Sequence, residues 1–178
     1  MPDIIQKLLQ EVGNARSAYL NKIANITEVQ AQWKPTPEEW NITEITEHLF
    51  WAENNGIIGM WKTLHAIREG SFEKTTESDH QAMSIEKIID ITWQPKEQVP
   101  AGAEPRFGGP ISFWRISFKN LQEILEAFAE DLKEDELRLQ AQKHPISGAL
   151  DFHQRFEFLR FHINRHEEQV SRLFEKMK

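Results

Sequence analysis

The chain has no cysteine among its 178 residues. This absence excludes disulfide bonds, thiolate metal ligands and a cysteine nucleophile, so any metal ligand must be histidine, aspartate or glutamate. A domain of this length buries roughly 70% of the surface of its unfolded chain, and it needs neither a disulfide nor a metal merely to fold. We therefore expect a single domain over residues 1–178, in which any metal serves function first.

Long apolar runs and an excess of basic residues are also lacking. No run approaches the ~20 apolar residues that span a bilayer, and Met1 to Lys7 contain no signal-peptide region. We therefore expect a cytoplasmic protein with no membrane partner. The 21 Lys and Arg are outnumbered by 28 Asp and Glu, for a formal charge of −7. Because binding to phosphates requires clustered basic residues, we expect no nucleic-acid partner, and a neutral or cationic small molecule fits this charge better.

Four stretches have the spacing of amphipathic helices: about residues 3–25, 42–70, 111–132 and 152–177. In each, apolar residues recur at alternating steps of three and four, which draws one apolar stripe along a helix. Asp3 is the expected N-cap of the first helix, and Asn41 to Glu44 resemble a capping box at the start of the second. Four such stripes predict an all-α fold, a four-helix bundle.

About 40 residues between the second and third stretches break this pattern. Residues 84–92 are expected to form a short helix, and residues 99–110, rich in proline and glycine, are expected to be irregular. A connection of this length predicts a long crossover between helices 2 and 3 of the bundle. Long loops in compact domains often cover functional sites, although a disordered or purely structural crossover is an equal alternative.

Two histidines four residues apart, His162 and His166, lie in the last stretch. On a helix this spacing places both imidazoles on one face, roughly 5–6 Å apart, close enough to hold one metal ion. The pair alone is weak evidence, because a chain with 7 histidines produces the spacing by chance fairly often. His48 lies between the core positions Ile45 and Ala52, so it faces the bundle interior. A divalent cation would satisfy one nitrogen on each of these three buried rings.

The other four histidines fail this geometric filter: His65, His80, His144 and His153. His65 lies roughly 25 Å along its helix from His48, and His153 points to the opposite side of its helix from His162. His144 precedes a proline in a connection. His80, in the crossover, is kept as a weaker candidate for a fourth ligand.

Two polar residues accompany the histidines. Gln169 lies seven residues after His162 on nearly the same face, where it could hydrogen-bond a ligand or substrate or be a solvated flank residue. Glu44 lies one turn before His48 and could orient a ligand or act as a base, although capping its own helix is the favoured role. Because Ile163 follows His162, the pattern His-Glu-x-x-His is absent, which argues against metalloprotease chemistry.

Two blocks of the sequence resemble the DinB/YfiT-like superfamily of metal-binding four-helix bundles. The matching residues are Trp40 followed by His48-Leu49, and His144-Pro145 to Gly148 followed by His162, His166 and Gln169. The likeness extends over nearly the whole chain. It implies one divalent metal ion, such as Zn, Ni, Fe or Mn, held by His48, His162 and His166.

The resemblance also implies a small-molecule substrate, since enzymes of that superfamily are similar to transferases and isomerases that use a low-molecular-weight thiol. Three histidine ligands leave an open coordination position, as catalytic metal sites do. We therefore predict an enzyme in which metal-bound water or a cosubstrate thiolate attacks a small electrophile, as a thiol S-transferase or a hydrolase. No catalytic side chain is assigned.

Two alternatives remain at this point: a non-catalytic metal-binding bundle that acts in sensing or assembly, and a bundle whose histidines are structural. Trp40, Trp93, Arg106 and Phe107 are candidates for lining a substrate pocket. Exposed apolar positions on the helices are compatible with a homodimer, and equally with an intramolecular core.

Overall fold

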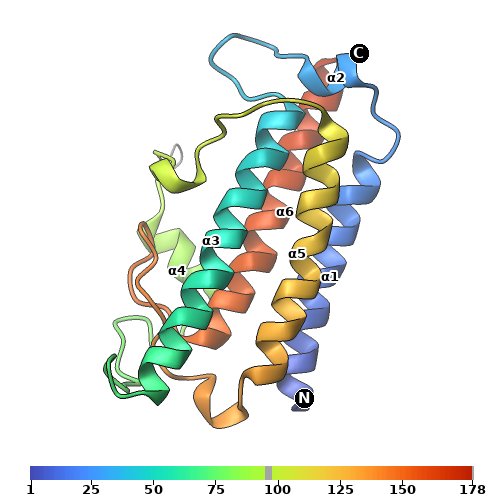
Figure 1. Ribbon diagram of the computed structural model, residues 1–178. Helices are drawn as coiled ribbons and strands as arrows, with labels where there is room; N and C mark the ends of the chain where they lie inside the picture. Colours follow the sequence, from blue (N-terminus) through green and yellow to red (C-terminus); the bar gives the residue numbers. More distant parts are fainter. Residues whose placement is uncertain (95–97, 178) are drawn as a thin grey trace.

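Four long helices pack side by side in the computed structural model, which describes residues 1–94 and 98–177 (Figure 1). They are α1 (Asp3–Lys22), α3 (Ile42–Arg68), α5 (Ile111–Asp131) and α6 (Phe152–Lys176). Helix α3 packs on α5 and α6, and α1 packs on the same two helices. The predicted all-α bundle is confirmed, and no helix of the described residues is long and apolar enough to cross a membrane.

The direction of the helices explains the long connection after α3. Helices α3 and α5 run in the same direction, opposite to α1 and α6 (Figure 1). The chain must therefore return along the whole bundle before α5 begins. The predicted crossover between the second and third bundle helices is confirmed, and it carries the short helix α4 (Ile85–Thr92) and a 3-10 turn, η1 (Ala101–Ala103).

The predicted apolar stripes form the core of the bundle. Every member of the α5 stripe is buried: Ile111, Trp114, Phe118, Leu121, Leu125, Phe128 and Leu132. The bundle also encloses an ion pair that the apolar pattern did not reveal. Arg16 of α1 donates to the Glu53 carboxylate of α3 at 2.6 Å, and both side chains are buried.

Capping boxes fix the starts of the two helices that carry the inward-facing histidines. At α3 the Asn41 side chain accepts from the Glu44 backbone N–H, and the Glu44 carboxylate accepts from the Asn41 N–H, as predicted. At α6 the side chains of Asp151 and Gln154 make the same reciprocal pair of bonds. Each box satisfies two backbone donors that the helix itself leaves free.

The N-terminal region differs from the prediction in two respects. Pro2, rather than Asp3, is the N-cap of α1, and Asp3 is the first helical residue, where its charge lies favourably near the free N–H groups of the first turn. Helix α1 ends at Lys22, and a five-residue helix, α2 (Glu28–Gln32), follows. Thr27 starts α2 with a capping box, and a helix of five residues is too short to show an apolar stripe.

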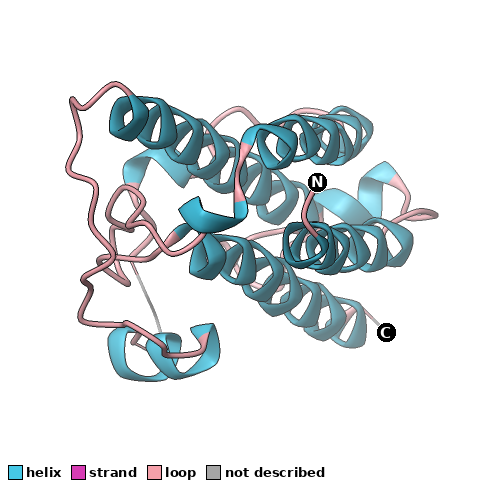
Figure 2. Ribbon diagram, turned by 90° about the horizontal axis from the view of Figure 1, so that it is seen from below, coloured by secondary structure: helices cyan, strands magenta, loops and turns pink. Residues whose placement is uncertain are grey.

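Two connections lie on the same side of the bundle, beside α3 and α6: the crossover between α3 and α5, and the segment between α5 and α6 (Figure 1; Figure 2). Helix α4 packs on α6 through its apolar face, where Ile85 and Ile88 contact Phe158 and Leu150. The segment between α5 and α6 contains a 3-10 turn, η2 (Glu134–Glu136), and two isolated bridges, Gln140 with Asp151 and His144 with Gly148. Both segments therefore cover the faces of α3 and α6 that carry the histidines.

Candidate metal centre

Three histidines meet between α3 and α6. The Nε2 atom of His162 lies 3.2 Å from Nε2 of His48 and 3.1 Å from Nε2 of His166. All three side chains are at most 8% exposed. Their candidate ligand atoms lie within 4.8 Å of one another, and the described residues contain no other group of three histidine or carboxylate side chains that could hold a metal ion. The structure thus brings together the three residues that the sequence singled out as ligands.

The outer nitrogens of these rings determine where the protons lie. His48 donates from Nδ1 to the carbonyl oxygen of Ala103 at 2.8 Å, and His166 donates from Nδ1 to Oε1 of Gln169 at 2.8 Å. Because both partners are acceptors, each Nδ1 carries the proton and each Nε2 presents a lone pair towards His162.

His162 cannot satisfy both of those lone pairs. A proton on its Nε2 can be donated fully to only one of the two facing nitrogens, and its buried Nδ1 has no hydrogen-bond partner. A divalent cation accepts electron pairs from all three Nε2 atoms at once, and imidazole is a usual ligand for such ions. The donor set therefore fits a metal ion better than it fits a hydrogen-bonded cluster.

Burial keeps the three rings neutral. It lowers the pKa of His48 to about 4 and the pKa of His166 to about 3. Burial also lowers the pKa of His162 well below its usual range, and the neighbouring His166 and His48 lower it further. At neutral pH all three lone pairs are available to a metal ion.

The crossover is fastened to α3 beside His48. The buried carboxylate of Glu47 accepts three backbone N–H groups at 2.8 to 2.9 Å, from Arg106, Phe107 and Gly108. About two turns further along α3, Asn55 donates to the carbonyl of Gly102 at 2.9 Å. These bonds hold η1, and with it the Ala103 carbonyl that orients His48. Glu47 was not among the residues predicted from the sequence, although a carboxylate adjacent to an inward-facing histidine was a usable signal.

A cavity of about 1060 Å³ opens beside the three histidines. Its walls are formed by α3, α6, crossover residues 98–103 and the loop 142–146, and both Trp40 and Trp93 line it. Arg106 and Phe107 do not line it, contrary to the expectation from sequence. Their backbone N–H groups donate to Glu47 instead, and the Arg106 guanidinium lies 4.5 Å from the centre of the Trp51 ring.

His144 also lines this cavity, although its position before a proline in a connection had not predicted this. The bridge between His144 and Gly148, a glycine with a φ of 71°, folds the loop back onto α6. There the His144 ring lies 4.3 Å from that of Phe158, which in turn stacks on His162. Burial lowers the pKa of His144 to about 3, and the nearby charge of Arg155 contributes. His144 is thus a neutral part of the cavity wall.

The model of the DinB superfamily matches residues 12–170. The chain belongs to the DinB superfamily. The resemblance drawn from the histidine motifs is therefore confirmed, and the match includes all three histidines. A search of curated proteins found no match to the sequence. Membership of this metal-binding superfamily and the three-histidine cluster together support a histidine-based metal site.

The remaining predicted residues of this DinB-superfamily chain have other partners. Gln169 holds His166, as described above, whereas Glu44 forms the helix cap and an ion pair with Lys34 at 2.7 Å. His65 lies 3.4 Å from the Asp131 carboxylate, and His153 lies 3.5 Å from that of Glu157. His80 donates from Nε2 to the Ser147 carbonyl at 2.8 Å, so it holds the loop before α6 and does not join the group of three.

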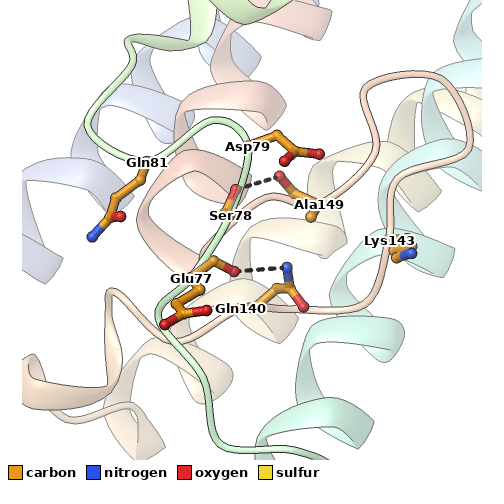
Figure 3. A pocket seen from close by; sticks show the side chains of 7 residues that line it. All are labelled: Glu77, Ser78, Asp79, Gln81, Gln140, Lys143 and Ala149. Carbon is orange, nitrogen blue, oxygen red and sulfur yellow. Dashed lines mark hydrogen bonds between the residues drawn. The ribbon is translucent and has the colours of Figure 1, made fainter.

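A second, shallower hollow lies between crossover residues 77–81 and the loop 140–149 (Figure 3). Ser78 donates to the Ala149 carbonyl at 3.2 Å, and Gln140 donates to the Glu77 carbonyl at 3.3 Å. These bonds tie the two segments together. No histidine lines this hollow, and its contacts serve to connect the loops.

Proposed function

We propose that this DinB-superfamily chain is a divalent-metal-dependent enzyme that acts on a small molecule. The observation that carries the proposal is the convergence of three neutral Nε2 lone pairs, from His48, His162 and His166, beside a cavity of about 1060 Å³. Closed structural sites usually have four protein ligands, whereas three protein ligands are typical of catalytic sites. When bound, the ion would lower the pKa of a water or thiol enough to supply hydroxide or thiolate at neutral pH.

The chain's own residues prepare this site for chemistry. Ala103 and Gln169 fix the orientation of two rings through their Nδ1 protons. The crossover, which Glu47 fastens to α3, shields the rings from bulk water. Since the chain has no cysteine, a thiol nucleophile would come from a cosubstrate, as in a thiol S-transferase; water as nucleophile would give a hydrolase.

Metal content is the first test. We expect protein purified without a histidine tag, incubated with Zn, Ni, Mn or Fe and then desalted, to retain about one equivalent of an ion. His48→Ala and His162→Ala are expected to lose it, while His65→Ala, at a half-exposed histidine outside the site, retains it. A parent protein that retains less than a few tenths of an equivalent of every ion would contradict the metal site.

Activity is the second test. Metal-loaded protein would be screened with low-molecular-weight thiols and small electrophiles for S-transfer, and with activated esters for hydrolysis. Turnover that disappears in His162→Ala and persists in His65→Ala supports the enzyme. Turnover equal in His162→Ala and the parent contradicts metal-centred catalysis. A chain that binds one ion and shows no turnover with any pair supports the alternative, a non-catalytic metal-binding bundle in sensing or assembly.

A further inference from the structure

Arg155 of α6 is a buried cation that has no carboxylate partner among the described residues, 1–94 and 98–177. Its side chain is only 6% exposed, and no aspartate or glutamate among the described residues forms an ion pair with it. Its Nη1 is buried and has no hydrogen-bond partner. Removing a guanidinium from water without a compensating anion is unfavourable, so this charge needs an explanation outside the fold itself.

Helix α3 leaves room for this guanidinium at the cavity. A Cβ added to Gly56 would lie 3.3 Å from Nη2 of Arg155, and both residues line the cavity beside the three histidines. Glycine inside a helix is unfavourable relative to alanine, so its presence near the middle of α3 is best explained by the close approach of Arg155.

A neutral donor lies on the same wall. His144 accepts backbone N–H groups from Ile146 and Ser147 on its Nδ1, at 3.3 and 3.0 Å. Its proton is therefore on Nε2. His144 lies next to Phe158, and the Arg155 guanidinium lies 6.0 Å from the centre of the same ring. The cavity wall thus combines an N–H donor with a cation that no described carboxylate pairs with.

The position of Arg155 relates this donor pair to the three histidines. Arg155 precedes His162 by seven residues, or about two helical turns, so both lie on the same face of α6, roughly 10 Å apart along the helix axis. A small molecule with two functional groups could therefore reach from an anion site at Arg155 to the three Nε2 atoms.

We propose that Arg155 and the Nε2–H of His144 bind a carboxylate of the substrate, whose reacting end lies at the three histidines. The substrate class is then a small molecule with a carboxylate at one end. This replaces the neutral or cationic ligand that the net charge favoured, because the local charge of the cavity wall, and not the total, decides what binds there. The position of the reacting end rests on the proposed function, whereas the carboxylate site needs no metal.

The test uses calorimetry with 6-mercaptohexanoate and its neutral counterpart 6-mercapto-1-hexanol on metal-free protein. We expect the carboxylate to bind the parent and Arg160→Gln equally, since Arg160 lies on the same helix but pairs with Glu86 outside the cavity. Arg155→Gln is expected to weaken binding of the carboxylate at least tenfold and to leave binding of the alcohol unchanged. The carboxylate affinity of Arg155→Lys is expected to lie between those of the parent and Arg155→Gln. Gly56→Ala, which favours the helix, is also expected to weaken carboxylate binding by displacing the guanidinium.

The proposal is overturned if Arg155→Gln binds the carboxylate within about twofold of the parent, or if the parent shows no saturable binding up to ~10 mM. Repeating the titration on zinc-incubated protein separates the two proposals. Arg155-dependent carboxylate binding by a protein that takes up no zinc would leave the carboxylate site standing and sink the metal site. Zinc uptake by a parent that does not bind the carboxylate would sink the carboxylate site alone.

Discussion

Replacing Arg155 by methionine is expected to stabilise the protein. Burial lowers the pKa of Arg155 to about 10, because the cavity disfavours the charged form. Relative to the usual pKa of arginine, this lowering corresponds to about 3 kcal/mol at ~1.4 kcal/mol per pKa unit. Because guanidinium stays charged at neutral pH, this penalty is present throughout pH 6–8.

The full 3 kcal/mol is an upper bound. Methionine keeps much of the apolar stem of arginine but loses the contact of the guanidinium with Gly56 and Phe158. We therefore expect Arg155→Met to raise the free energy of unfolding by about 1–3 kcal/mol. A gain in stability with loss of carboxylate binding is the pattern expected of a residue kept for function.

Urea unfolding at pH 7, followed by circular dichroism, measures this change. The slope against urea should stay the same while the midpoint rises. Arg160→Met, which removes a partly exposed ion pair with Glu86, is the matched control and should lie within about 0.5 kcal/mol of the parent. An Arg155→Met protein less stable than the parent by more than about 1 kcal/mol would refute the reasoning, because it would show that the charge supports the fold.

Three further predictions concern the histidine cluster. Glu47→Ala should lower the free energy of unfolding by about 3 kcal/mol in urea titrations, because three backbone N–H groups of the crossover lose their buried acceptor; a loss below about 1 kcal/mol would mean that the crossover is held by other contacts. Gln169→Ala should weaken zinc binding about 10–100-fold in competition with a chelator, since it frees Nδ1 of His166, and unchanged affinity would remove Gln169 from the site. Metal-free protein should lose stability as the pH falls from 6.5 towards 4, because the histidines bind protons in the unfolded state and stay neutral in the folded state. Each proton bound only by the unfolded state lowers the free energy of unfolding by about 1.4 kcal/mol per pH unit. His166→Ala should show a shallower pH dependence, and equal slopes for the two proteins would show that His166 is not held neutral.

The bundle and the histidine cluster could be predicted because helix geometry alone relates the residues involved. A spacing of four places His162 and His166 on one face, and the apolar stripe of α3 turns His48 inward. The distance between the two helices did not have to be known, since inward-facing side chains of packed neighbours meet. The capping box at Asn41 was predictable for the same reason, because it is a local pattern.

Residues outside the helical repeat could not be placed in this way. The position of His144 depends on a loop whose path is set by its bridge to Gly148, and the contacts of Glu47 depend on where the crossover runs. Arg155 was within reach of the sequence, because it lies on the same face of α6 as His162. A charged residue on a core-facing stripe is as informative as the histidines.

Zinc binding to metal-free parent and to His162→Ala, measured by calorimetry with the metal content of each sample confirmed by mass spectrometry, tests the central claim most directly. The three converging Nε2 atoms predict one zinc ion per parent chain. In His162→Ala the zinc affinity is expected to fall by at least a hundredfold, because His162 lies between the other two ligands. Zinc binding of equal stoichiometry and affinity in both proteins would contradict the account.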